Sequence, residues 1–240
     1  MYSGLPAVGK TAFAITLLKN IGVEQQIPVA LFSLELTNAQ IVKRLLKNIA
    51  FNHESIDCDL FEDMLAIGKE DQYKLLESPI YLDDTASMSI DEIDPIVASF
   101  ASSKGIKLVI INYLQLIQSF QVKGDEIMKR LKAIALAHGV CIIALSQLNK
   151  NLNPIKSYVS NSVNDLFKKN SKAIINHSDI VLLLCRHKCN NHLGNFTEHQ
   201  DIAEVIVLKG QSIQNMIVNL YFIPDYVKFT ELKSNNYLIR

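Results

Sequence analysis

The chain has 240 residues, of which 49% are apolar and 20% charged, a balance typical of a folded globular protein. Its formal net charge is zero, which excludes bulk electrostatic attraction to nucleic acid but leaves room for a local basic lining. No apolar run approaches the ~18 residues of a membrane span, and no signal peptide is visible. Because the four cysteines are too few and too scattered for a disulfide framework, we expect a reduced, cytoplasmic setting.

The first predicted element is a glycine-rich loop followed directly by a helix over residues 12–18. Residues 4–11 have the pattern G-x-x-x-x-G-K-T of a phosphate-binding loop. Its backbone N–H groups converge on phosphate oxygens, Lys10 supplies a positive charge, and Thr11 supplies a hydroxyl to Mg²⁺. We therefore predict nucleotide contacts from Gly4, Pro6, Ala7, Val8, Gly9, Lys10 and Thr11.

A phosphate-binding loop normally follows a buried strand, and only three residues precede Gly4. We therefore expect this supporting strand to be missing. The chain would then be a piece of a longer protein or the product of a truncated reading frame.

Apolar runs of strand length then alternate with helical patterns. The predicted strands cover residues 28–34, 80–84, 107–112, 140–147 and 180–185, and the predicted helices cover 37–49, 121–138, 166–176 and a segment that opens at a Ser89–Glu92 capping box. From residue 202 the pattern changes to strand–turn–strand, at 203–208, 216–222 and 227–230. This order predicts one α/β domain over residues 1–240, with a mostly parallel sheet, helices on both faces and an antiparallel C-terminal extension.

Polar side chains end three of the predicted buried strands. Glu35, Asn112 and Gln147 stand at these ends, where ligands bind in open α/β sheets. Glu35 is the carboxylate placed to orient or deprotonate a water molecule, and Gln147 is placed to sense a terminal phosphate. The alternative for Glu35 is an ordinary exposed charge after a strand.

Five segments resemble DnaB-type replicative helicases, in the family's order and over nearly the whole chain. They are residues 32–36 (F-S-L-E-L), 81–84 (Y-L-D-D), 111–116 (I-N-Y-L-Q-L), 144–150 (A-L-S-Q-L-N-K) and 203–209 (A-E-V-I-V-L-K). The resemblance implies a RecA-like P-loop fold, ATP and Mg²⁺ as ligands, a homo-hexameric ring with single-stranded DNA in its channel, and other replication proteins as partners. It also implies roles for three residues: Glu35 as the catalytic base, Gln147 as the link from γ-phosphate to the DNA-binding loops, and Lys209 as a contact to a neighbour's ATP.

Two positions depart from the family pattern. Asn112 stands where the family has an aspartate that helps to hold Mg²⁺, so metal affinity should fall. Gln211 stands where the arginine finger is expected, a group that contributes roughly 10³–10⁵ in rate in related NTPases. We expect nucleotide binding with weak or no hydrolysis. The alternative is a catalytically inactive ATP-binding subunit or gene remnant. A third interpretation, a RecA-like repair or recombination ATPase, is disfavoured by the F-S-L-E-L and N-Y-L-Q-L segments.

Basic residues and one Cys/His cluster supply further candidates. Contacts to DNA phosphates are predicted from Lys123, Lys129, Arg130 and Lys169, with Lys132, Lys168 and Lys172 as further candidates. The alternative is a solvated basic helix face.

Cys185, His187, Cys189 and His192 suggest a zinc site, although their spacing fits one poorly. The alternative there is a strand end followed by a polar loop.

Overall fold

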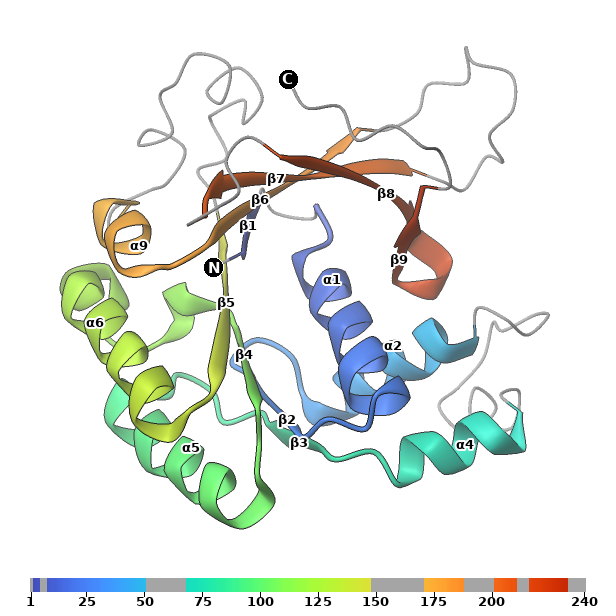
Figure 1. Ribbon diagram of the computed structural model, residues 1–240, viewed down its shortest axis with the longest axis horizontal. Helices are drawn as coiled ribbons and strands as arrows, with labels where there is room; N and C mark the ends of the chain where they lie inside the picture. Colours follow the sequence, from blue (N-terminus) through green and yellow to red (C-terminus); the bar gives the residue numbers. More distant parts are fainter. Residues whose placement is uncertain are drawn as a thin grey trace.

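One curved sheet organises the chain, with helices on both of its faces (Figure 1). The computed structural model describes residues 2–4, 8–50, 68–147, 171–187, 201–210 and 216–232. Within these ranges, nine strands form the sheet in the order β3-β2-β4-β5-β1-β6-β7-β8-β9. The sheet curls around α1 and α2 in Figure 1, whereas α5, α6 and α9 lie on its outer face.

Six of these strands pair in parallel. They are β1 (Tyr2–Gly4), β2 (Val29–Ser33), β3 (Ile80–Asp83), β4 (Leu108–Asn112), β5 (Cys141–Gln147) and β6 (Val181–His187). Every residue of β2 and β4 is buried, which explains why their sequences are apolar without alternation. The parallel sheet predicted from these runs is confirmed.

The last three strands form the antiparallel extension predicted from residue 202 onward. They are β7 (Asp201–Lys209), β8 (Ile217–Ile223) and β9 (Lys228–Glu231). β7 pairs antiparallel with both β6 and β8, and β9 pairs antiparallel with β8. Together with the parallel strands, this extension confirms the α/β architecture.

The expectation that no strand supports the glycine-rich loop is wrong. Residues Tyr2–Gly4 form β1, which lies between β5 and β6 and pairs in parallel with both. The sequence Tyr-Ser-Gly shows no apolar run, so its pattern did not predict a strand. Hydrogen bonding to a neighbour on each edge defines β1 in the absence of that pattern.

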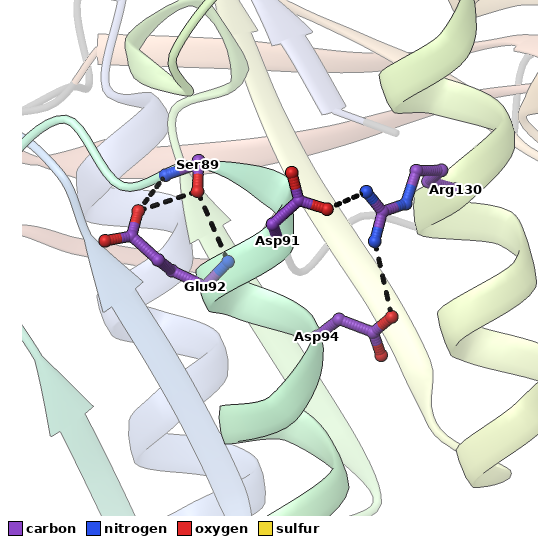
Figure 2. A network of polar contacts seen from close by, with 5 residues as sticks. All are labelled: Ser89, Asp91, Glu92, Asp94 and Arg130. Atoms are coloured by element: carbon purple, nitrogen blue, oxygen red, sulfur yellow. Dashed lines mark hydrogen bonds and ion pairs between the residues drawn. The ribbon is translucent and has the colours of Figure 1, made fainter.

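Two of the helices, α2 and α5, begin at side-chain caps. The helices are α1 (Lys10–Leu17, continued by the π-helical η1, Leu18–Glu24), α2 (Asn38–Ile49), α4 (Lys69–Leu76), α5 (Ile90–Lys104), α6 (Phe120–His138) and α9 (Ser171–His177). Thr37 and Ser89 each form a full capping box, with Gln40 and Glu92 respectively. Figure 2 shows the second of these at the start of α5. Residues 149–164, where the Asn- and Ser-rich sequence with Pro154 predicts a loop, lie outside the described residues. α9 covers the second half of the helix predicted over 166–176.

Two apolar cores flank the sheet. On the outer face, Ile93 of α5 and Leu131 of α6 pack with buried residues of β2, β4 and β6. On the inner face, Ile15 of α1 and Leu46 of α2 pack with other buried residues of the same three strands. None of the helices in the described ranges combines the length and apolar character needed to cross a membrane.

A buried polar cluster ties the last strand to the first helix. Thr16 Oγ1 donates to Ala12 O (3.0 Å) and accepts from Phe229 N (3.2 Å) and Asn48 Nδ2 (3.3 Å). Asn48 Nδ2 also donates to Val227 O (2.8 Å). Thr16 is 7% exposed and Asn48 0%, so water cannot replace these bonds. The cluster therefore holds β9 against α1 and α2.

Substituting Thr16→Val should lower the free energy of unfolding by about 1–3 kcal/mol, because the Phe229 N–H and the Asn48 amide lose a buried acceptor. The midpoint of urea unfolding measures the change. Ser102→Ala is the matched control, since the Ser102 hydroxyl donates to Ser99 O on the exposed side of α5 and its loss should cost less than about 0.5 kcal/mol. Equal losses in the two variants would contradict a structural role for the Thr16 cluster.

Candidate nucleotide-binding site

A cavity of about 320 Å³ opens where the carboxyl ends of the parallel strands meet the start of α1. It brings together Gly9, Lys10, Thr11, Glu35 and Gln147, all predicted to act at one site. Its other lining residues are Ala12, Leu36, Arg44, Tyr113, Arg186, Phe222 and Val227. These residues converge at one edge of the sheet because β2, β4 and β5 run parallel to one another.

Gly9 makes the turn into α1 possible. Its φ is +104°, a backbone conformation that L side chains rarely adopt. A Cβ at this position would also lie 3.0 Å from the Phe229 ring. The position therefore admits glycine for two independent reasons, and the helix N-terminus that follows presents free N–H groups to the cavity. Val8 is buried beside it, and Gly4 ends β1.

Lys10 opens α1 and is 7% exposed. Burial lowers the pKa of its ammonium group from 10.5 to about 8, and the negative charge of Glu35 partly opposes that shift. A buried ammonium favours an anion beside it, so the first turn of α1 is suited to phosphate.

Thr11 and Asn112 face each other inside the cavity wall. The Thr11 hydroxyl donates to Asn112 Oδ1 at 3.5 Å. Asn112 is 1% exposed, and its Nδ2 has no hydrogen-bond partner among the described residues. A buried N–H without an acceptor costs ~1–3 kcal/mol, so a ligand that supplies an acceptor gains from this position.

The hydroxyl of Thr11 and the amide oxygen of Asn112 are the kind of ligand that Mg²⁺ prefers, together with phosphate oxygens of a nucleotide. The residues therefore fit Mg²⁺, but without the negative charge that a carboxylate would add. The described residues contain no group of three His, Cys, Asp or Glu side chains that could hold a metal by themselves.

Glu35 is exposed at the mouth of the cavity, just beyond β2. The turn that carries it is held by Ser33 Oγ, which donates to Leu36 O at 2.6 Å, and by Leu34 N, which donates to Asn112 O at 2.9 Å. Burial raises the pKa of the Tyr113 hydroxyl, and the charge of Glu35 raises it further; the same charge opposes the lowering of the Lys10 pKa by burial. A water molecule between Glu35 and a bound phosphate would be oriented from this position.

Gln147 is held by a neighbour that the strand-end argument missed. Gln115, in the 3₁₀ turn η3 (Leu114–Leu116), accepts from Gln147 N at 3.2 Å through its Oε1. Its Nε2 donates to Ser146 Oγ at 2.8 Å and to Gln147 O at 3.2 Å. Gln115 therefore fixes the end of β5 and the backbone that carries Gln147.

Two arginines that sequence reasoning missed also line the cavity. Arg44 comes from α2 and makes no ion pair or hydrogen bond with the described residues. Arg186 comes from β6 and lies over the Phe222 ring, 4.8 Å from its centroid. Together with Lys10, these arginines give the cavity three cationic side chains. Among the described lining residues, Glu35 supplies the single carboxylate.

Comparison with known proteins decides the family. The family model described as "DnaB-like helicase C terminal domain" matches residues 1–231. This chain belongs to that family. The replicative DNA helicase DnaC of Bacillus subtilis is 31% identical over 243 residues, covering 95% of this chain and 51% of that protein. The replicative DNA helicase DnaB of Geobacillus stearothermophilus is 31% identical over 245 residues, with the same coverage of 95% and 51%.

Solved structures agree with the family at the level of the fold. One solved ATPase domain superimposes with a TM-score of 0.72 at 24% identity, covering 97% of this chain and 84% of that one. A DnaB-like replicative helicase, solved with its interactions with primase, gives 0.76 at 25% identity, covering 97% and 57%. The RecA-like fold and the resemblance to DnaB-type helicases are thereby confirmed. The chain spans about half the length of the curated relatives it matches.

Within this DnaB-like domain, the basic face of α6 is occupied by ion pairs. Lys129 pairs with Asp125 at 2.7 Å. Arg130 pairs with Asp91 and, at 3.5 Å, with Asp94, which joins α6 to α5 (Figure 2). Lys132 similarly pairs with Asp179. These contacts correspond to the alternative of a helix face with structural and solvated charges, and any contact to DNA phosphates would have to compete with them.

The remaining predicted residues lie away from the cavity or outside the described ranges. Lys209 Nζ donates to Ile175 O (2.7 Å) and Asn176 O (3.4 Å) at the end of α9, so it does not reach the cavity of its own chain. Lys123 is exposed near the start of α6. Outside the described residues lie Pro6, Ala7, Lys168, Lys169, Gln211, Cys189 and His192.

The zinc interpretation gains no support from the one cysteine of its cluster that is described. Cys185 is 5% exposed and belongs to the outer apolar core. Burial, with the charge of Glu204, raises the pKa of its thiol to about 12, which keeps it protonated. Cys185 therefore fits the alternative given for this cluster, in which it ends a strand that is followed by a polar loop.

Substituting Arg44→Ala should raise the Kd for nucleotide by about tenfold or more, because a hydrogen bond to a charged group contributes ~1.5–3 kcal/mol. Titration with a fluorescent nucleotide measures it. Lys43→Ala, the adjacent cation on α2 that does not line the cavity, is the matched control and should leave the Kd unchanged. The same loss in both variants would show that α2 acts through its general charge.

Proposed function

We propose that this chain is the RecA-like ATPase domain of a cytoplasmic replicative DNA helicase with weakened hydrolysis. In this proposal it binds ATP with Mg²⁺, holds single-stranded DNA within a homo-hexameric ring, and couples slow ATP turnover to unwinding. The observation that carries the weakened turnover is Asn112, a buried neutral amide whose Oδ1 accepts a hydrogen bond from Thr11, one of the residues that line the cavity. Other replication proteins are partners in the proposal, which is supported by the similar helicase that was solved with its interactions with primase.

The roles of the residues follow from their positions. Lys10 and the N-terminus of α1 hold the phosphates, and Arg44 adds a cation from α2. Thr11 would hold Mg²⁺ with Asn112 Oδ1 behind it; Mg²⁺, when bound, neutralises charge on the phosphates. Glu35 orients water for attack on the terminal phosphate, and Gln147 senses that phosphate from the end of β5. Lys209 would act on the ATP of a neighbouring subunit.

Asn112 weakens the chemical step more than the binding step. An aspartate would bring a negative charge to the metal, whereas the amide brings none, so less Mg²⁺ is held at a given concentration. The cations of the cavity are not reduced by this change, and they retain the nucleotide. Binding without rapid turnover is therefore the expected behaviour.

Substituting Asn112→Asp should lower the Mg²⁺ concentration needed for half-maximal ATP turnover, and combining it with Gln211→Arg should raise turnover further, by up to roughly 10³-fold or more if the arginine acts as a finger. Steady-state phosphate release with and without single-stranded DNA measures both. Asn112→Ser, which has no carboxylate, is the control and should not gain turnover. Turnover of the unchanged chain at the rate of a DnaB-type helicase measured alongside would refute the weakened enzyme.

A second function is favoured by the same Asn112 and by Gln211: an ATP-binding subunit without turnover, with a structural or regulatory role in a ring. Mixing this chain with an active relative distinguishes the two. A folded double variant (Asn112→Asp with Gln211→Arg) that forms mixed rings but gains no turnover would favour this second function.

Nucleotide affinity should fall as pH rises through about 8. The pKa of Lys10 is lowered to about 8, and a bound phosphate favours its charged form, so binding is complete below this pKa and is lost progressively above it. Between pH 7 and pH 9.5 the Kd for ATP should rise by about tenfold. Lys10→Arg should remove most of this pH dependence, because a guanidinium stays charged throughout the range. An unchanged slope in that variant would assign the effect to another group.

A further inference from the structure

The neighbouring strands β4 and β5 stop pairing before β5 ends. Their ladder finishes at the pair Ile111–Ala144. β5 then continues to Gln147, and its last three residues pair with β1 on the far edge. β4 ends at Asn112 and, among the described residues, offers these three no strand partner. The backbone that carries Gln147 therefore has a strand beside it on one edge and needs other hydrogen bonds on the edge toward β4.

The side chain of Gln115 supplies these hydrogen bonds. Its Oε1 accepts from Gln147 N at 3.2 Å, and its Nε2 donates to Gln147 O at 3.2 Å. A neighbouring strand would likewise bind both the N–H and the C=O of one residue. The Nε2 group also donates to Ser146 Oγ at 2.8 Å, and Ser146 is fully buried. Three hydrogen bonds from one amide therefore fix the last two residues of β5.

Gln115 is itself carried by a well-anchored turn. In η3, Ile117 N donates to Leu114 O at 3.1 Å. Leu114 and Ile117 are 0% and 2% exposed, and both belong to the outer apolar core. The turn follows Asn112 almost directly in the chain, so the Gln115 amide joins the end of β4 to the end of β5.

The side chain of Gln147 is less constrained than its backbone. It lines the cavity, and it makes no hydrogen bond with the rest of the described chain. Such a side chain reaches one atom of a ligand reproducibly only if the backbone beneath it is fixed, because hydrogen bonds tolerate little displacement. Without the Gln115 amide, residue 147 would be held by β1 on one edge alone. The position of the Gln147 amide in the cavity therefore depends on Gln115.

We propose that Gln115 is the positioning residue for Gln147 and fixes its backbone so that the Gln147 amide meets the terminal phosphate of a bound nucleoside triphosphate. Gln115 thereby helps the site to distinguish a triphosphate from a diphosphate, which lacks that group. Gln115 is not among the described residues that line the cavity, so it acts through Gln147 and not by touching the nucleotide. The inference rests on the proposed function, in which Gln147 senses the terminal phosphate.

The Kd values for AMP-PNP and for ADP, measured with Mg²⁺ by displacement of a fluorescent nucleotide, test the inference without requiring turnover. Gln147→Ala removes the sensing amide. Gln115→Met removes the three hydrogen bonds at nearly constant side-chain length, and Gln115→Asn keeps an amide that is one methylene too short to reach residue 147 from the same turn. Gln118→Met is the matched control, because Gln118 is exposed and its backbone N–H, which donates to Met88 O, is kept. The Tm of each variant checks that it is folded.

Gln147→Ala should raise the Kd for AMP-PNP about tenfold and leave the Kd for ADP unchanged, because it removes a hydrogen bond to a charged group that ADP lacks. Each Gln115 variant should raise the Kd for AMP-PNP about threefold or more, again without an effect on ADP. Adding Gln115→Met to Gln147→Ala should cause no further loss, because the two residues act as one unit. Gln118→Met should change neither Kd.

Three results would overturn the role of Gln115 while leaving the proposed function in place. They are an unchanged Kd for AMP-PNP in the folded Gln115 variants, a rise of equal size for ADP, and additive losses in the double variant. An unchanged Kd for AMP-PNP in Gln147→Ala would instead overturn the sensing role of Gln147, and the inference with it.

Discussion

Lys10 places a positive charge where only 7% of the residue's surface reaches solvent. Much of the inner face serves to position this buried side chain. The ammonium group loses hydration and has one carboxylate, Glu35, acting on it from across the cavity. Gly9 allows the chain to turn sharply enough to place Lys10 there, and the Thr16 cluster holds β9 and its Phe229 ring against the same turn. The charge of Lys10 would stabilise an anion bound in the cavity. The proposed phosphate binding rests on the electrostatics of this buried side chain and on the helix that it begins.

The charges around that site are the basis for the proposal that it holds a nucleotide more readily than it cleaves one. Among the described residues that line the cavity, Lys10, Arg44 and Arg186 face a single acid, Glu35, and the position opposite Thr11 is an amide. Within the described part of the chain, Asn112 Nδ2 is a buried donor without an acceptor, a cost that an oxygen acceptor would relieve. A carboxylate at residue 112 would instead repel phosphate and attract the metal. In the proposed function, this one neutral side chain shifts the balance from catalysis toward retention.

On the outer face, charges serve a different purpose. Asp91 and Asp94 of α5 meet Arg130 of α6, and Asp94 also meets His138 at 3.2 Å. Asp125 of α6 meets His177 of α9 at 2.8 Å. These pairs join helices that contact one another mainly along an apolar seam, and they are partly exposed, so each contributes little to stability. Their effect is to set which helix faces meet, and they occupy cations that would otherwise be available to a polyanion.

The sequence by itself determined the elements whose signals are local. Apolar runs located β2 and β4, because both faces of these strands are covered, and the capping box at Ser89 located one helix start. The order of five family segments determined the fold and the gathering of Lys10, Thr11, Glu35 and Gln147.

Tertiary structure decided what depends on distant partners. β1 exists through hydrogen bonds on both of its edges, Arg44 reaches the cavity from a helix that the strand-end rule does not consider, and Arg130 finds Asp91 across 39 positions of sequence. Local patterns record backbone preference and burial, whereas pairing across the fold is fixed when the sheet and its helices pack.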